Sequence, residues 1–295
     1  DLLNHMSKEI AKIVSMSTHL TELLLALFAF SISFSLAYIT QIEIVKNAVL
    51  LAFIIQWVLF IPAYIFQTEK FYDLSGSITY ISVVSYSFYN NYNSTDLNFG
   101  NIILSLLIIV WAIRLGSFLF IRIKKAGEDI RFREIKKSPS RFFMTWTLQG
   151  MWVSICSACA IAGIANGIEI NSYFYAGLLI FTLGFITEII ADNQKSKFRK
   201  DPINKDKFIT SGIWKYSRHP NYLGEITLWL GISVISFSSL QGLELLTLIS
   251  PIFTYILLVY ISGVRILEYN GNKKWGHLES YNEYKKNTPR LIGFL

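Results

Sequence analysis

Long apolar runs separated by short polar segments occupy most of the chain. A helix that crosses a bilayer needs about 20 mostly apolar residues, and fewer when it lies among other helices. Seven runs qualify: Thr21–Tyr38, Asn47–Phe66, Phe99–Ile123, Phe143–Ala165, Tyr173–Ala191, Leu223–Phe237 and Leu245–Ser262. A shorter run, Ser77–Tyr89, is an eighth candidate. Because backbone groups in lipid must pair within their own segment, the pattern predicts an all-α, polytopic transmembrane bundle of seven or eight helices.

Charge is scarce and unevenly placed. The 295 residues are 53% apolar and 16% charged, whereas soluble domains average about 25% charged residues. Of the 27 Lys and Arg residues, eight lie in Arg122–Arg141, eight in Lys195–Arg218 and six in Arg265–Arg290. Such asymmetry orients membrane helices, so we expect these segments and the C-terminal tail to face the cytosol. The net charge of +7 then suits anionic lipids or a phosphate-bearing ligand, and no nucleic-acid partner is expected.

The chain has no linker rich in proline, glycine and serine, which predicts a single membrane domain, residues 1–295. Residues 1–141 form generic apolar helices, whereas residues 142–295 hold nearly all the polar groups that need an explanation.

The first polar group ends a predicted helix. Glu188, Asp192, Lys195 and Arg199 follow one another at spacings of four, three and four, so they share one helix face. Ionisable groups inside a membrane span are a functional hypothesis by default. A salt-bridge ladder at a helix end is the equally weighted alternative. The cations suit a phosphate, because a guanidinium offers a planar fork of donors.

The second polar group is SGIWKYSRHPNYLGEITLWLG. Pro220 suits the first turn of a helix, which places Arg218 and His219 at its positive end, where anions bind. Asn221 and Glu225 then share a face of that helix, although each residue alone could be a cap or an interfacial anchor.

The third polar group follows the last span. It contains Arg265 and Glu268, and it leads into a Tyr-rich tail whose Tyr281 and Tyr284 read as ordinary interfacial aromatics. There is no Rossmann fingerprint, P-loop, HExxH or serine-elbow motif, and the four histidines are scattered. No metal site is expected, and a nucleotide would have to bind between helices.

At these three segments the sequence resembles the DUF1295 family, relatives of steroid 5α-reductase and of the membrane sterol reductases. The matching strings are EIIADNQKSKFRK, GIWKYSRHPNYLGEITLW, and SGVRILE followed by WGHLESYNEY, with fainter likeness in GEDIRFR, TLQG and YDLSG. An RHPxYxG core also occurs in membrane methyltransferases of the isoprenylcysteine and phospholipid type. Glu225 directly after the glycine, and the ADNQ string, favour the reductase branch.

The resemblance implies a helical bundle that holds NADPH in a cavity open to the cytosol, with residues 1–141 on the substrate side. It implies catalytic roles for Tyr72, Asp73 and Glu225. The implied cofactor contacts are Glu188, Asp192, Lys195, Arg199, Tyr216, Arg218, His219, Asn221 and Arg265. The predicted reaction is NADPH-dependent reduction of the C=C bond of an enone in a lipid-soluble substrate such as a steroid or sterol.

Trp111 stands where the resemblance leads us to expect a carbonyl-polarising tyrosine, three residues before Arg114. Two alternatives accompany the reductase. One is a methyltransferase that uses S-adenosylmethionine on a lipid or isoprenylcysteine and shares the RHP-containing turn. The other, kept open by Trp111, is a non-catalytic subunit of a membrane complex. The expected location is the endoplasmic reticulum or a bacterial inner membrane, with the mitochondrial inner membrane as a further option.

Overall fold

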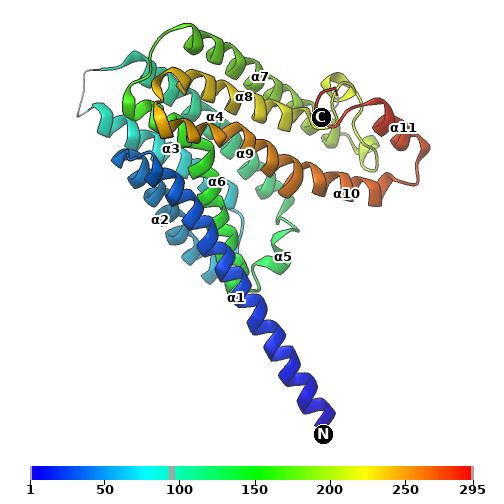
Figure 1. Cartoon of the computed structure of the whole chain (residues 1–295). Coiled ribbons are helices and arrows are strands. Elements are labelled where there is room, and N and C mark those ends of the chain that lie inside the picture. Colours follow the sequence, from blue (N-terminus) through cyan, green and yellow to red (C-terminus); the bar gives the residue numbers. More distant parts are fainter. Residues whose placement is uncertain (1, 93–96, 294–295) are drawn as a thin grey trace. The chain divides into compact units, whose positions relative to one another are not determined.

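The structure is a computed structural model that describes residues 2–92 and 97–293, with side chains described from residue 16 onward. Within these ranges every regular element is helical, which confirms the predicted fold class (Figure 1). The α-helices are α1 Leu2–Ile39, α2 Glu43–Ile65, α3 Tyr72–Tyr92, α4 Phe99–Ala126, α5 Phe132–Ile135, α6 Pro139–Asn166, α7 Ser172–Lys200, α8 Pro220–Ser236, α9 Ser250–Ile256, α10 Val264–Trp275 and α11 Glu279–Asn287. The short 3-10 elements are η1 Pro202–Asn204, η2 Gly212–Lys215, η3 Phe237–Ser239 and η4 Gly242–Ile249, and η5 Leu257–Ile261 is a π-helix.

Among the described residues, six helical stretches are long and apolar enough to cross a membrane, so the chain is an integral membrane protein. They are Met16–Ile39, Glu43–Ile65, Phe99–Ala126, Pro139–Asn166, Ser172–Lys200 and Gly242–Trp275. The remaining predicted spans, Ser77–Tyr89 and Leu223–Phe237, are also helical and correspond to α3 and α8. The α8 helix has only 17 residues, and α3 carries many hydroxyl and amide side chains. The count of seven or eight spans and the orientation of the tail stay predictions.

The chain folds into two compact units. The first comprises residues 1–167 with 242–247, and the second comprises residues 168–241 with 248–295.

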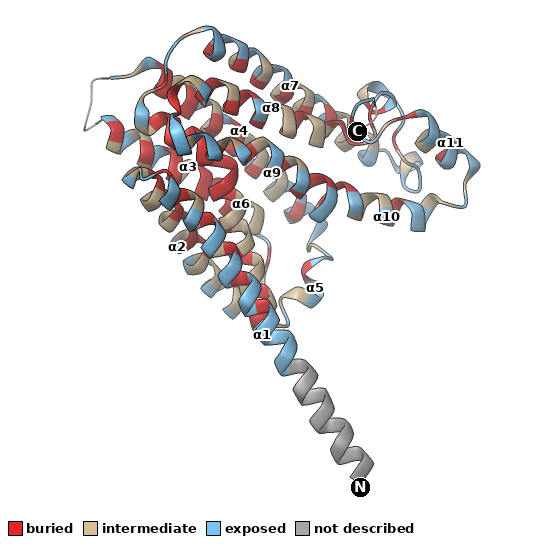
Figure 2. Ribbon diagram, viewed as in Figure 1, coloured by how far each residue is buried: buried red, intermediate tan, exposed pale blue. Residues whose placement is uncertain are grey.

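In the first unit, α6 packs against α1, α2 and α3. The most apolar stretch of α6 is 78% buried, compared with 28% to 33% for the other candidate spans, and residues 153–164 of α6 are all buried, whereas its first half alternates between buried and intermediate residues (Figure 2). Its middle reads SICSACAIAG. Small side chains let neighbouring helices approach closely, which explains why a central helix is built this way.

In the second unit, α7 and α8 pack backbone against backbone. A Cβ placed on Gly184 would lie 2.5 Å from the backbone nitrogen of Leu228, and one on Gly224 would lie 2.6 Å from that of Glu188. Gly177 and Gly231 make the same kind of contact further along. Only glycine permits so close an approach, and it leaves little room for the side chains beside it. The carboxyl-bearing side chains of this region are therefore buried.

The last part of the second unit folds back on itself. The π-helical turn η5 ends where the Ser262 backbone N–H and hydroxyl both donate to the carbonyl of Leu257, at 2.8 and 3.0 Å. The chain then continues as α10 and α11. Leu291 is buried against Val259 and Val264, so the C-terminal segment is anchored to the end of the unit.

Candidate functional site

A cavity of about 140 Å³ lies within the second unit. It is formed by the end of α7, the segment between α7 and α8, α10 and α11. Four cations line it, Lys195, Arg199, Lys207 and Arg218, and so do six Phe, Trp and Tyr residues, Phe198, Phe208, Trp214, Trp275, Tyr281 and Tyr284. His219, Glu268, Ile209, Leu267 and Gly271 complete the lining. Cations and aromatic rings together suit a ligand that combines anionic groups with a flat ring.

The polar part of this cavity centres on Glu268. Its Oε1 lies 2.9 Å from His219 Nε2 and 3.2 Å from Arg218 Nε. Arg218 also donates from Nη1 to the carbonyl of Lys285 at 2.9 Å. Glu268 therefore holds together Arg218 and His219 of the turn at residues 218–220, which we call the RHP turn.

Three polar atoms at this turn are buried and lack a hydrogen-bond partner among the described residues. They are Arg218 Nε, which has only the ion pair with Glu268, His219 Nδ1 and Asn221 Oδ1. Buried polar groups in native proteins are almost always hydrogen-bonded, so an unpartnered one beside a cavity points to a ligand or a water molecule as the missing partner.

Burial lowers the pKa of His219 below its ordinary value, and this effect outweighs the opposing hydrogen bond and charge of Glu268. We therefore treat the imidazole as neutral at pH 7. A neutral imidazole carries one N–H, and the network assigns it to Nε2, since Glu268 is an acceptor there. Nδ1 is then an acceptor.

Three aromatic residues of the wall have their polar groups bonded to backbone carbonyls. Trp214 Nε1–H donates to Ala191 at 3.2 Å, and Trp275 Nε1–H donates to Asp206 at 2.6 Å. The Tyr284 hydroxyl donates to the carbonyl of Trp214 at 2.5 Å, and burial raises its pKa to about 12, so it stays protonated. These rings therefore offer carbon surface to the cavity.

The C-terminal segment fixes the RHP turn. The backbone N–H of Arg218 donates to Pro289 at 3.0 Å, and that of His219 donates to Arg290 at 3.1 Å. The Ser217 hydroxyl also donates to the carbonyl of Arg290, at 3.2 Å. This segment thus supports the Arg218 and His219 backbone from outside the lining of the cavity.

The structure brings together only some of the predicted cofactor residues. Lys195, Arg199, Arg218 and His219 line the cavity. Glu188, Asp192 and Glu225 are buried and do not line it, whereas Tyr216 and Arg265 are exposed and do not line it either. Asn221, with its buried Oδ1, is also outside the lining.

Sequence reasoning did not select the aromatic wall. The sequence predicts Tyr281 and Tyr284 as interfacial aromatics, and in the structure both line the cavity. The signal was present in the WGHLESYNEY string, which places both tyrosines close to Trp275.

The residues predicted as catalytic in the first unit lie at the start of α3. The Tyr72 hydroxyl donates to the carbonyl of Thr145 at 3.0 Å, so its proton is already committed. Burial raises the pKa of the Asp73 carboxyl, against the opposing charges of Arg122 and Arg131. Trp111 is buried, with its ring edge-on to Tyr80 and the centroids 5.1 Å apart.

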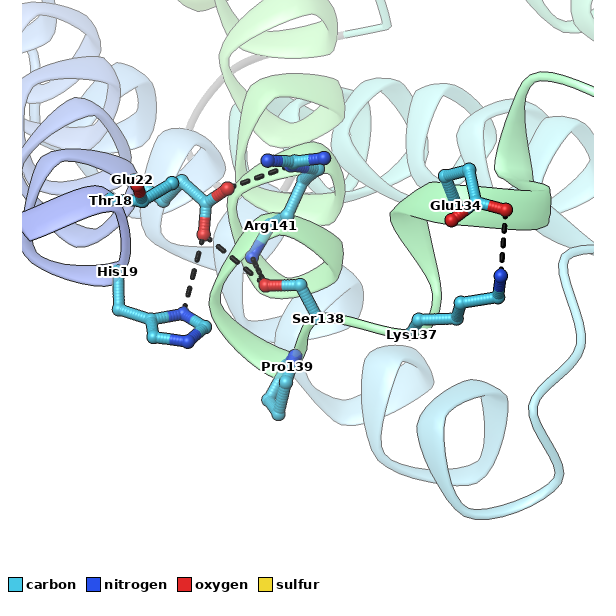
Figure 3. Close-up of a pocket in the computed structure, with 8 residues that line it drawn as sticks. All are labelled: Thr18, His19, Glu22, Glu134, Lys137, Ser138, Pro139 and Arg141. Atoms are coloured by element: carbon cyan, nitrogen blue, oxygen red, sulfur yellow. Dashed lines mark hydrogen bonds and ion pairs between the residues drawn. The ribbon is translucent and has the colours of Figure 1, made fainter. Parts of the chain in front are cut away.

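A second cavity, of about 370 Å³, lies in the first unit at the start of α6 (Figure 3). The Glu22 carboxylate accepts from Arg141 Nε at 2.7 Å, from the Ser140 hydroxyl at 2.5 Å and from the Ser138 hydroxyl at 3.3 Å. His19 Nδ1 lies 2.5 Å from the Ser140 oxygen. The larger cavity is the weaker candidate, because its buried carboxylate is satisfied within the protein and no aromatic ring lines it.

Fold and cavity together define a multi-pass helical membrane protein with a pocket of cations and aromatic rings in its second unit. The family described as "Protein of unknown function (DUF1295)" matches residues 59–288, well over half of the chain, and the chain belongs to this family. No solved structure matches the chain.

The chain is similar to three kinds of curated proteins. The Ustilaginoidea virens protein named Probable O-methyltransferase ustE is 33% identical over 94 residues, 31% of this chain and 33% of that protein. The Delta(14)-sterol reductase of Arabidopsis thaliana is 27% identical over 128 residues, 39% of this chain and 31% of that protein. The 3-oxo-5-alpha-steroid 4-dehydrogenase 1 of Mus musculus is 28% identical over 122 residues, 41% of this chain and 42% of that protein. The matches thus span about a third to two fifths of these relatives.

Proposed function

We propose that the protein is a membrane-embedded reductase that binds NADPH at the cavity of the second unit. The observation that carries the proposal is a cavity lined by cations and aromatic rings, one of whose lining residues, His219, has a buried Nδ1 without a hydrogen-bond partner among the described residues. Structural ion-pair clusters satisfy their own atoms, whereas an orphaned acceptor calls for a ligand. The distant relationship to steroid and sterol reductases supports a reductase.

The lining residues fit part of a dinucleotide. Lys195, Arg199 and Lys207 offer positive charge to phosphates, and the aromatic wall offers carbon surface to a ring. Sites for whole drug-sized ligands measure roughly 300–1,000 Å³, so a cavity of about 140 Å³ takes in only one end of the cofactor. When bound, NADPH would supply a hydride.

The proposed substrate is an enone in a lipid-soluble molecule. Reduction of its C=C bond leaves negative charge on the carbonyl oxygen, which a positioned hydrogen-bond donor stabilises. Asp73 is the proposed donor, because its raised pKa favours the protonated carboxyl. The reductase proposal predicts that Asp73→Asn, which keeps a donor, retains more activity than Asp73→Ala.

The test uses the full chain purified in detergent. NADPH binding is measured by nicotinamide fluorescence, and oxidation by absorbance with a panel of enone lipids. Arg199→Ala is expected to weaken binding about tenfold, the loss of one charge-assisted hydrogen bond, whereas the exposed Arg133→Ala in the first unit has no effect. Absence of NADPH binding, together with no oxidation across the panel, would overturn the proposal.

A methyltransferase is the second candidate, favoured by the relative named as an O-methyltransferase and by the RHP core. It would bind S-adenosylmethionine at the same cavity. Thermal unfolding of the same preparation with each cofactor separates the two: the true cofactor raises the unfolding temperature at lower concentration.

A non-catalytic subunit of a membrane complex is the third candidate, favoured by Trp111 at the position where a catalytic tyrosine is expected. It predicts that Arg199→Ala and Glu225→Ala leave both assembly and cellular function unchanged.

A further inference from the structure

We propose that the cavity binds the adenine ring of its cofactor, that His219 Nδ1 accepts a hydrogen bond from the adenine 6-amino group, and that Glu268 acts as a positioning residue that enforces this selection. The inference rests on the proposed function and names the part of the cofactor that the cavity recognises.

Size and lining point to a flat ring. The volume of about 140 Å³ is too small for a dinucleotide, and six Phe, Trp and Tyr side chains line it. Their indole N–H and phenol groups, where bonded, face backbone carbonyls, so the walls recognise a ring by stacking. Base-to-aromatic stacking contributes about 1–3 kcal/mol per base and tolerates any base. Specificity must therefore come from a polar contact.

The polar contact available is an acceptor. His219 Nε2 lies 2.9 Å from Glu268 Oε1, which fixes the ring hydrogen on that side. Nδ1 then presents a lone pair, buried and without a partner among the described residues. The ligand group that meets it must be a donor, such as an aromatic amine, and an oxo group would oppose two lone pairs.

Glu268 prevents His219 from adopting the other neutral tautomer, which would accept an oxo group in place of an amino group. The other neutral tautomer would carry its hydrogen on Nδ1 and accept an oxo group, but it would turn the bare Nε2 toward the Glu268 carboxylate. That arrangement loses a hydrogen bond and sets a lone pair against a negative charge. Arg218, 3.2 Å from the same carboxylate oxygen, holds Glu268 in place.

Cations also line the cavity. Lys195 Nζ lies 4.6 Å from the centroid of the Trp214 ring, and Arg199 comes from the next turn of α7. A purine stacked on the wall would leave its sugar and phosphates toward these cations. The cavity thus has an acceptor for the base and cations for the phosphates.

The test compares NADPH with reduced nicotinamide hypoxanthine dinucleotide phosphate, in which an oxo group replaces the 6-amino group. Both are titrated against the full chain in detergent by nicotinamide fluorescence. We expect the hypoxanthine cofactor to bind at least about tenfold more weakly, because it loses one hydrogen bond and sets the lone pairs of its oxo group against that of Nδ1. Equal binding of the two would overturn the adenine assignment and leave NADPH binding intact, whereas binding of neither overturns the proposed function itself.

Glu268→Gln tests the positioning role. A glutamine can turn its amide to donate to Nε2, which releases the other tautomer, so the tenfold preference should shrink to less than about threefold. Glu283→Gln, an exposed acid of α11, is the matched control and should keep the full preference. An unchanged preference in a Glu268→Gln protein that unfolds at the wild-type temperature would refute the tautomer lock. His219→Ala should abolish the preference, and its persistence there would refute the contact.

Discussion

The two units each contain a cluster in which a glutamate is held by a histidine and an arginine. In the first unit, Glu22 pairs with Arg141 and lies 3.6 Å from His19. In the second unit, Glu268 lies between His219 and Arg218. The residue types are the same, but their surroundings differ. Serine hydroxyls complete the first cluster, whereas aromatic rings and an unpartnered Nδ1 surround the second.

The comparison shows that residue types alone do not define a binding site. The Glu22 cluster joins α1 to the start of α6, and every oxygen of its carboxylate accepts a hydrogen bond, so it reads as a structural tie (Figure 3). The Glu268 cluster leaves a buried acceptor beside a cavity. A candidate site therefore differs from a structural ion-pair cluster in having a buried polar atom, here His219 Nδ1, without a hydrogen-bond partner among the described residues.

The largest contrast is expected between the two arginines. Arg218→Met leaves the Glu268 carboxylate without its arginine and breaks the bond to Lys285, which should cost about 3 kcal/mol of stability and weaken NADPH binding at least about a hundredfold. Arg141→Met removes a half-exposed arginine from Glu22 and should leave NADPH affinity unchanged. Thermal unfolding and NADPH titration of both variants test this, and equal losses of affinity would erase the distinction between the clusters.

The next effect concerns the tail, which only the second cluster depends on. Leu291→Ala opens a cavity against Val259 and Val264, and such changes cost about 2–5 kcal/mol in a packed core. Because the adjacent Pro289 and Arg290 carbonyls hold the RHP turn, the NADPH affinity of Leu291→Ala should fall together with its stability. Ile292→Ala, at an exposed neighbour, should change stability by less than about 0.5 kcal/mol. Unfolding temperatures and titrations that do not separate the two variants would contradict the role of the tail.

Much of the fold is readable from local patterns. Apolar runs of span length predict helices, and the structure has helices at all of them. The same local reasoning brings Lys195 and Arg199 together on one face of α7, and it puts Arg218 and His219 at the start of α8. Periodicity and helix-start signals act within a few residues, so they survive without knowledge of the tertiary structure.

The rest of the site depends on contacts across long stretches of sequence. Glu268 meets His219 from 49 residues away, and Tyr284 reaches the carbonyl of Trp214 across 70 residues. Neither pairing leaves a local signal. Glu188 shares a helix face with Lys195 by spacing, but it lies beside the glycine contact of α7 with α8, where it is buried and does not line the cavity. The burial of Glu188 follows from the packing of α7 against α8, which its spacing from Lys195 in the sequence does not show.

A smaller effect is expected from Glu22→Gln in the first cluster. The glutamine keeps a carbonyl acceptor for the serines but loses the charge attraction to Arg141, which is half exposed, so the loss should be about 1 kcal/mol. NADPH affinity and the preference for adenine should not change. A loss of cofactor binding in a variant that unfolds near the wild-type temperature would mean that the first cluster takes part in the site.

The smallest effect is a dependence on pH that only the second cluster should show. Burial lowers the pKa of His219 in the folded protein below its ordinary value of 6.5, so the unfolded chain takes up a proton first as the pH falls. The contribution of His219 to stability is therefore constant well above pH 6.5, declines as the pH falls through that value, and stops changing once the pH is below the lowered pKa. Protonation would also place a donor on Nδ1, so affinity for NADPH should fall in the same range while the hypoxanthine cofactor gains relative to it. His219→Gln, measured over the same range, should flatten both curves. If the wild-type protein and this variant lose stability and adenine preference in parallel as the pH is lowered, the titrating group lies elsewhere and the second cluster is as self-contained as the first.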